Sequence, residues 1–143
     1  MKFWDSSALV PLVSREASSA ALQKLARNDP SMVVWAFSPV EIYSALARKR
    51  RRGESTAADL RQCRRRLDDL SRAWHAVQSV DLVLRRARKV LDLHDLRAPD
   101  SLQLAAALVA CGEEPSRLPF VALDDRLAEA AEREGFSVLD GKA

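Results

Sequence analysis

The 143-residue sequence is poor in the residues that covalent cross-links and irregular loops require. It contains only four glycines, six prolines and two cysteines, which excludes a disulfide-stapled scaffold and a low-complexity chain. Its longest apolar run, from Leu104 to Cys111, is far shorter than the roughly 20 residues of a membrane-spanning helix. Because 48% of the residues are hydrophobic, we predict one globular domain over residues 1–143.

The cysteines and the N-terminal segment predict a cytoplasmic protein. Cys63 and Cys111 lack the spacing of a metal site, and Cys111 falls in the apolar run, where a reduced and buried thiol is expected. The segment MKFWDSSALVPLVSRE (1–16) lacks the apolar centre and small-residue cleavage site of a signal peptide. We therefore expect a reducing compartment and no membrane association.

Basic residues concentrate in the middle of the chain, although the net charge is only +3. Arginine is dense at 48–54 and 61–69, and its guanidinium group suits bidentate contacts with phosphate. Arg50, Arg51 and Arg52 are the candidates for contact with a nucleic-acid backbone. The alternative is that these helices carry solvated basic faces with no ligand.

Short apolar segments alternate with helical patterns along the whole chain. The predicted strands are 2–4, 32–36, 120–123 and 137–139. The predicted helices are 6–13, 16–27, 38–51, 56–72, 81–93, a helix headed by Asp100, and 124–134. This alternation predicts an α/β fold, a three-layer α/β/α sandwich with a central parallel sheet.

Four acidic residues lie at the ends of predicted strands or at the starts of helices. Asp5 follows the first strand, Glu41 lies in the first turn of the helix after the second, and Asp124 follows the third. Asp100 heads the apolar helix. Ligands of open parallel sheets bind beyond the carboxyl ends of the strands, so we expect these four side chains to converge there. Mg²⁺ and Mn²⁺ prefer such all-oxygen ligands and neutralise their mutual repulsion.

Each acid also has a purely structural interpretation. Glu41 has the spacing of a capping box with Ser38. A helix cap or a favourable first-turn position accounts for Asp100 and Asp124, and an Asx-turn accounts for Asp5. None of these interpretations explains why all four acids fall at the same edge of the sheet.

Four segments together resemble the PIN-domain family, and most closely the VapC-type ribonuclease toxins of prokaryotic toxin–antitoxin pairs. They are FWDSSALVPLV (3–13), SPVEIYSAL (38–46), LRAPDSLQLAAAL (96–108) and FVALDDRLAEAAEREGFSVL (120–139). The resemblance implies a PIN-like sandwich whose acidic cluster binds Mg²⁺ or Mn²⁺ and cleaves RNA. It also implies a homodimer that is neutralised by a cognate VapB-type antitoxin.

By position, the resemblance assigns the catalytic and metal-binding roles to the same four acids. Relatives often carry Ser or Thr two residues before the fourth acid, Asp124, where this chain has Ala122, so Asp125 remains its rival. Ser7 occupies a position where relatives place a small polar residue near the metal. The implied chemistry is metal-dependent phosphodiester hydrolysis, in which Glu41 binds metal or orients the attacking water.

Other protein classes with acids beyond parallel strands fit the sequence less well. A response-regulator receiver domain requires paired acids early in the chain, and Asp5 has no acidic neighbour. A phosphatase of the haloacid dehalogenase type requires a second aspartate where this chain has Ser7. A non-catalytic module that binds nucleic acid or protein remains the alternative. His94 is expected to have a capping or surface role.

Overall fold

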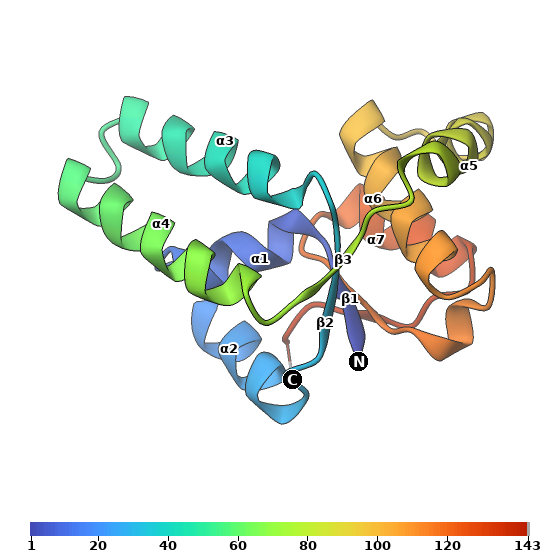
Figure 1. Ribbon diagram of the computed structural model, residues 1–143, viewed down its shortest axis with the longest axis horizontal. Coiled ribbons are helices and arrows are strands. Elements are labelled where there is room, and N and C mark those ends of the chain that lie inside the picture. The colour runs from blue at the N-terminus through green and yellow to red at the C-terminus, as the bar shows by residue number, and fades with distance from the viewer. Residues whose placement is uncertain (143) are drawn as a thin grey trace.

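A computed structural model describes residues 1–142 and places a five-stranded parallel sheet between two layers of helices (Figure 1). The strands are β1 (Lys2–Trp4), β2 (Met32–Trp35), β3 (His75–Val77), β4 (Phe120–Val121) and β5 (Val138–Leu139), in the spatial order β3-β2-β1-β4-β5. The helices are α1 (Ser6–Val13), α2 (Ser19–Asn28), α3 (Ser38–Arg51), α4 (Ala57–Ser71), α5 (Val80–Leu93), α6 (Ala98–Ala110) and α7 (Asp125–Arg133), with a 3-10 turn at Pro115–Arg117. The predicted three-layer sandwich is confirmed.

Successive residues of the strands pack into two separate cores, one on each face of the sheet. Phe3 lies in the core covered by α5, α6 and α7, whereas Trp4 lies in the core covered by α1, α2, α3 and α4. Both side chains are fully buried, and so is Trp35. Burying side chains of this size is worth about 1.5–3 kcal/mol each, so both faces of the sheet contribute to stability.

The apolar run of the sequence forms most of α6, which contacts α5, α7 and β2. Residues 103–108 are all buried, which explains why this helix has no polar face along that stretch. Within residues 1–142, no helix is long and apolar enough to cross a bilayer.

Two elements differ from the sequence-based expectation. The strand β3 was not predicted, because its three residues are partly exposed at the edge of the sheet and show no alternation of apolar and polar side chains. The second helix begins at Ser19 rather than at residue 16. The Ser19 hydroxyl accepts a hydrogen bond from the Glu16 N–H at 2.8 Å and donates to the Ser14 carbonyl at 3.1 Å, so these residues form a turn before the helix.

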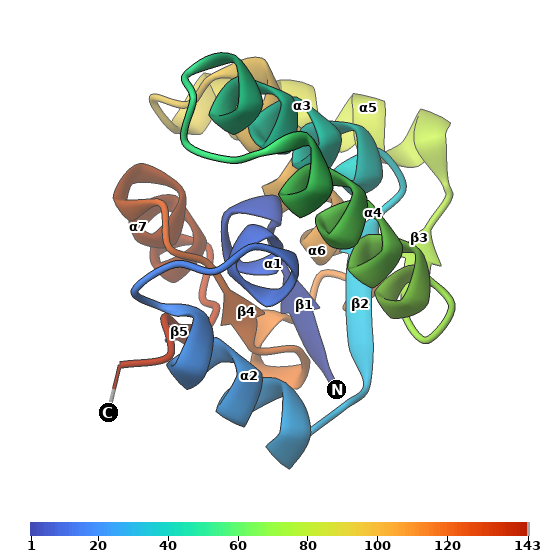
Figure 2. The same cartoon turned by 90° about the vertical axis from the view of Figure 1, so that its left-hand side faces the viewer.

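The register of the central strands places two of the predicted acids at one edge. Trp4 pairs with Val121, and the Asp5 N–H donates to the Val121 carbonyl at 2.9 Å. Asp5 therefore leaves the end of β1 close to the turn that leads from β4 to Asp124. On one side of the sheet, α3 and α4 extend outward as a pair, and α5, α6 and α7 cover the other side (Figures 1 and 2).

Candidate active site

All four predicted acids line one pocket of about 480 Å³ at the carboxyl edge of the sheet. Asp5 and Asp124 are the N-cap residues of α1 and α7, and Glu41 and Asp100 lie in the first turns of α3 and α6. Ser7 lines the same pocket. The convergence expected from the ends of the strands is therefore present.

Asp5 is the most buried of the four acids, with 2% of its surface exposed. Its Oδ2 atom accepts hydrogen bonds from the Ser7 N–H at 3.0 Å and the Ser7 hydroxyl at 2.5 Å. Its Oδ1 atom is buried and has no partner among the described residues. Burial raises the pKa of Asp5 to about 7, and the charges of Glu41 and Asp100 act in the same direction. The unpartnered oxygen makes Asp5 available to a cation.

Ser7 joins two elements that are far apart in the sequence. Its hydroxyl donates to Asp5 and accepts a hydrogen bond from the Leu123 N–H at 3.0 Å. Ala122 has no hydroxyl with which to bond the turn after β4. The Ser7 hydroxyl, which comes from α1, bonds that turn instead. Ser7 holds the end of β1 against the turn that carries Asp124.

Glu41 does not form the predicted capping box. The N-cap residue of α3 is Phe37, and Ser38 is a buried residue within the helix that makes no capping hydrogen bond. Instead, Glu41 Oε2 accepts from the Ser6 hydroxyl at 2.6 Å and Oε1 accepts from Gln103 Nε2 at 3.2 Å. Burial raises the pKa of Glu41, while these two donors oppose that rise. The structural interpretation of Glu41 is therefore wrong.

Asp100 and Asp124 both line the pocket, but their surroundings differ in nearby charges and in hydrogen bonds. Burial raises the pKa of Asp100, followed by the nearby charge of Asp124, whereas Arg97 acts to lower it. Asp124 Oδ1 accepts from the Leu127 N–H at 2.9 Å, so its predicted role as a helix cap is confirmed. Asp125 lines a different pocket, which makes Asp124 the acid closer to the other three.

The carboxylates fit a hydrated divalent cation better than one coordinated only by protein. Over residues 1–142, no three or more Asp, Glu, His or Cys side chains are close enough to form a ready-made metal site. Asp5 Oδ1 lacks a partner, and no hydrogen bond engages the Asp100 carboxylate within the described part of the chain. Mg²⁺ usually keeps several waters and binds one or two carboxylates, and these two acids meet that requirement.

Four residues of the pocket or its supports were not singled out from the sequence. They are Ser6, Arg48, Arg97 and Gln103. Arg48 follows Glu41 by seven residues, or two helical turns, so both lie on one face of α3. Gln103 likewise follows Asp100 by three residues on α6. These spacings were visible in the sequence, but the hydrogen bond from Gln103 to Glu41 joins two helices and could not be read from either.

Two other predicted features lie outside the pocket. Arg50, Arg51 and Arg52 are exposed at the end of α3 and do not line it. His94 is the C-cap residue of α5, but its side chain is only 7% exposed and its Nε2 lies 2.8 Å from Glu134 Oε1. Of the two expected roles, capping or surface, His94 therefore has the capping position, and its side chain packs against Glu134, the C-cap residue of α7.

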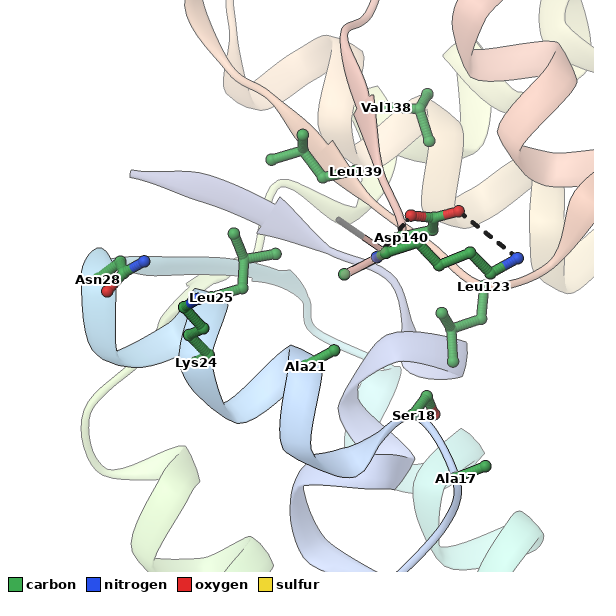
Figure 3. A pocket seen from close by; sticks show the side chains of 12 residues that line it. Ala17, Ser18, Ala21, Lys24, Leu25, Asn28, Leu123, Val138, Leu139 and Asp140 are labelled. Carbon is green, nitrogen blue, oxygen red and sulfur yellow. Dashed lines mark hydrogen bonds and ion pairs between the residues drawn. The ribbon is translucent and has the colours of Figure 1, made fainter.

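A larger pocket of about 890 Å³ lies between α2 and β5 (Figure 3). Its walls include Ala21, Leu25 and Leu139, and none of the four predicted acids reaches it. Its one acid, Asp140, lies 3.7 Å from Lys142 in an ion pair. The larger pocket therefore lacks the carboxylate cluster, and the smaller one is the candidate site.

The chain is similar to a known ribonuclease over nearly its whole length. The chain is 34% identical to Ribonuclease VapC46 of Mycobacterium tuberculosis (strain ATCC 25618 / H37Rv) over 143 residues, which cover 96% of this chain and 95% of the relative. No protein-family model matches it.

Solved structures show the same fold at low sequence identity. The fold resembles a chain of a toxin–antitoxin complex from Klebsiella pneumoniae, with a TM-score of 0.67, 17% identity and coverage of 99% of this chain and 98% of the other. It also resembles a chain of FitAcB from Neisseria gonorrhoeae, with a TM-score of 0.69, 12% identity and the same coverage.

Proposed function

The chain belongs to the VapC family of PIN-domain ribonuclease toxins, and we propose that it hydrolyses RNA phosphodiester bonds in the pocket lined by the four acids. The observation that carries this proposal is their convergence. Asp5, Glu41, Asp100 and Asp124 come from four separate helices and line one pocket. Structural roles account for some of these acids one by one, but they do not account for the shared pocket.

We propose Mg²⁺ or Mn²⁺ as the cofactor. Asp5, through its unpartnered Oδ1, and Asp100 would hold the ion directly, and Asp124 and Glu41 would hold it directly or through water. A bound divalent ion would supply positive charge to the phosphate oxygens and lower the pKa of an attacking water. Burial is the main cause of the raised pKa values of Asp5, Glu41 and Asp100, and the charge of a neighbouring acid adds to each rise; a bound cation would offset both effects.

The protein itself fixes the orientation of two of the acids. The two hydrogen bonds from Ser7 hold one oxygen of Asp5 and leave the other without a protein donor. Ser6 and Gln103 hold both oxygens of Glu41 from opposite helices. Each Glu41 oxygen keeps a second lone pair, with which it can accept a hydrogen bond from a water and orient it.

We further propose that residues 1–143 act as one PIN-like domain in the cytoplasm, as a homodimer neutralised by a VapB-type antitoxin. Similarity to VapC46 and to a chain of a toxin–antitoxin complex supports the antitoxin. Exposed apolar side chains on α3 and α5, among them Val40 and Leu93, provide surface for protein contacts. Arg50, Arg51 and Arg52 are proposed to contact the RNA backbone.

The test is cleavage of total RNA by purified protein with Mg²⁺, with Mn²⁺ or with EDTA. Wild type is compared with Asp5→Asn and Asp100→Asn, and Asp125→Asn serves as the control because Asp125 lies outside the pocket. Discrete metal-dependent fragments should appear with wild type and the control only. Equal cleavage by all four proteins would indicate a contaminating ribonuclease. A toxic effect that survives both pocket substitutions would favour a non-catalytic binding module.

A further inference from the structure

Two arginines line the acidic pocket without pairing to any of its acids. Arg48 lies on α3, two turns after Glu41, and Arg97 is the N-cap residue of α6, three residues before Asp100. Within residues 1–142, neither guanidinium group lies within ion-pair distance of a carboxylate. Among the described residues, the Arg48 side chain makes a single hydrogen bond, to the Ser44 hydroxyl at 3.4 Å.

These two arginines come from opposite layers of the sandwich. The buried residues of α3 belong to the core that contains Trp4, and those of α6 belong to the core that contains Phe3. The two helices therefore lie on opposite faces of the sheet (Figure 1), and the pocket spans the boundary between the layers. Arg48 and Arg97 thus stand on opposite walls of the pocket.

Neither arginine is paired with an acid of the pocket, although the charge of Arg97 acts to lower the pKa of Asp100. A guanidinium group that compensates a carboxylate normally forms a bidentate ion pair with it, and neither arginine does so. Both side chains are exposed at the rim, where they can reach a ligand that enters the pocket. Guanidinium groups match the geometry of phosphate oxygens, so a phosphate chain is the ligand that both could bind at once.

We propose that Arg48 and Arg97 form two phosphate-binding subsites on either side of the bond to be cleaved. The RNA backbone then crosses the pocket from the α3 layer to the α6 layer, with the scissile phosphate between them at the acids. This inference rests on the proposed function, because it takes RNA as the ligand. Its consequence is that the substrate must carry a phosphate on each side of the scissile one.

The first experiment measures RNA binding as a function of salt. The variants are Arg48→Gln and Arg97→Gln. The control is Arg27→Gln, because Arg27 is exposed and forms no ion pair within the described residues. Arg27 lies in the last turn of α2, just before β2 begins, and so at the edge of the sheet opposite to the pocket. Anisotropy of a labelled single-stranded RNA is measured from about 50 to 200 mM salt, with Ca²⁺ in place of Mg²⁺ and intact RNA verified by gel.

Each pocket variant should reduce the slope of log affinity against log salt by about 0.7, the value for one phosphate contact on a single strand. The dissociation constant should rise about three- to tenfold, and the control should match wild type. Slopes equal to that of the control in both pocket variants would overturn the proposal. These slopes do not depend on turnover, so reduced slopes in a protein that never cleaves RNA would contradict the proposed cleavage but still show that Arg48 and Arg97 bind phosphates at the pocket.

The second experiment locates each subsite along the RNA. Single flanking phosphates are replaced in turn by uncharged methylphosphonates in an otherwise identical oligonucleotide. On one side of the scissile phosphate, one replacement should weaken binding by wild type but not by Arg48→Gln, because that variant has already lost its contact with this phosphate. On the other side, one replacement should weaken binding by wild type but not by Arg97→Gln, for the same reason. Additive losses at every position would mean that neither arginine contacts a flanking phosphate.

Discussion

The Gln103 carboxamide donates a hydrogen bond to Glu41 at 3.2 Å from a position with no exposed surface. The same nitrogen donates to Ser38 Oγ at 3.1 Å. A buried amide in an otherwise apolar stretch of helix lowers stability unless its hydrogen bonds are made, and among the described residues Gln103 makes them through Nε2 and not through Oε1. Gln103 therefore has a specific partner, and that partner is one of the four acids.

Replacing Gln103 by Leu should impair cleavage through Glu41. Without the amide donor the pKa of Glu41 should rise further, because hydrogen bonds to the carboxylate favour its ionised form. The acidic limb of the pH–activity profile should then shift to higher pH. The measurement is kcat against pH for wild type and Gln103→Leu. An unshifted profile with uniformly lower activity would indicate a packing role only.

Metal-free protein should lose stability as the pH rises from about 4 to above 7. The pKa of Asp5 is about 7 in the folded protein and 3.8 ordinarily, so the folded state retains a proton that the unfolded state has released. This contribution, a few kcal/mol at most, is fully present below pH 3.8 and disappears as the pH passes 7.

The measurement is the melting temperature in EDTA at several pH values, for wild type and Asp5→Asn. The variant should show a flatter profile, and added Mg²⁺ should stabilise wild type more at pH 8 than at pH 5.5. Parallel profiles for the two proteins would contradict the assignment of the raised pKa to Asp5.

Asp100→Asn should lower cleavage by at least roughly 100-fold, because it removes a proposed metal ligand. It should also leave the metal-free melting temperature unchanged or raise it. Burial and the charge of Asp124 both disfavour ionised Asp100, and the amide relieves that repulsion. Thermal unfolding in EDTA tests the second part, and a clearly lower melting temperature for the variant would count against it.

Replacing Arg50, Arg51 and Arg52 by Gln should weaken RNA binding and reduce its dependence on salt. These residues are exposed at the end of α3 and lie outside the pocket, so the rate of cleavage at saturating RNA should change little. The measurement is the slope of log affinity against log salt, with Arg27→Gln as a control that removes a single exposed arginine outside this segment. A slope equal to that of the control would show that this segment does not contact phosphate.

The positions of the acids could be predicted because each follows a strand or begins a helix. Parallel strands bring their carboxyl ends to one edge, so Asp5, Glu41 and Asp124 had to lie near each other once the strands were recognised. The strand β3 lacked such a signal because an exposed edge strand has no apolar pattern. The capping box failed at Ser38 for a different reason: its hydroxyl bonds to Gln103, which is distant in sequence, and local spacing carries no information about such a partner.

The hydrogen bond between Gln103 and Glu41 also connects the two halves of the sandwich. Each half has its own core, and both cores pack against the same hydrogen-bonded sheet. Glu41 belongs to the half that contains α3, and Asp100 to the half that contains α6. Their separation is therefore set by how two different helices pack on one shared sheet, and the hydrogen bond from Gln103 to Glu41 ties those helices together across the pocket.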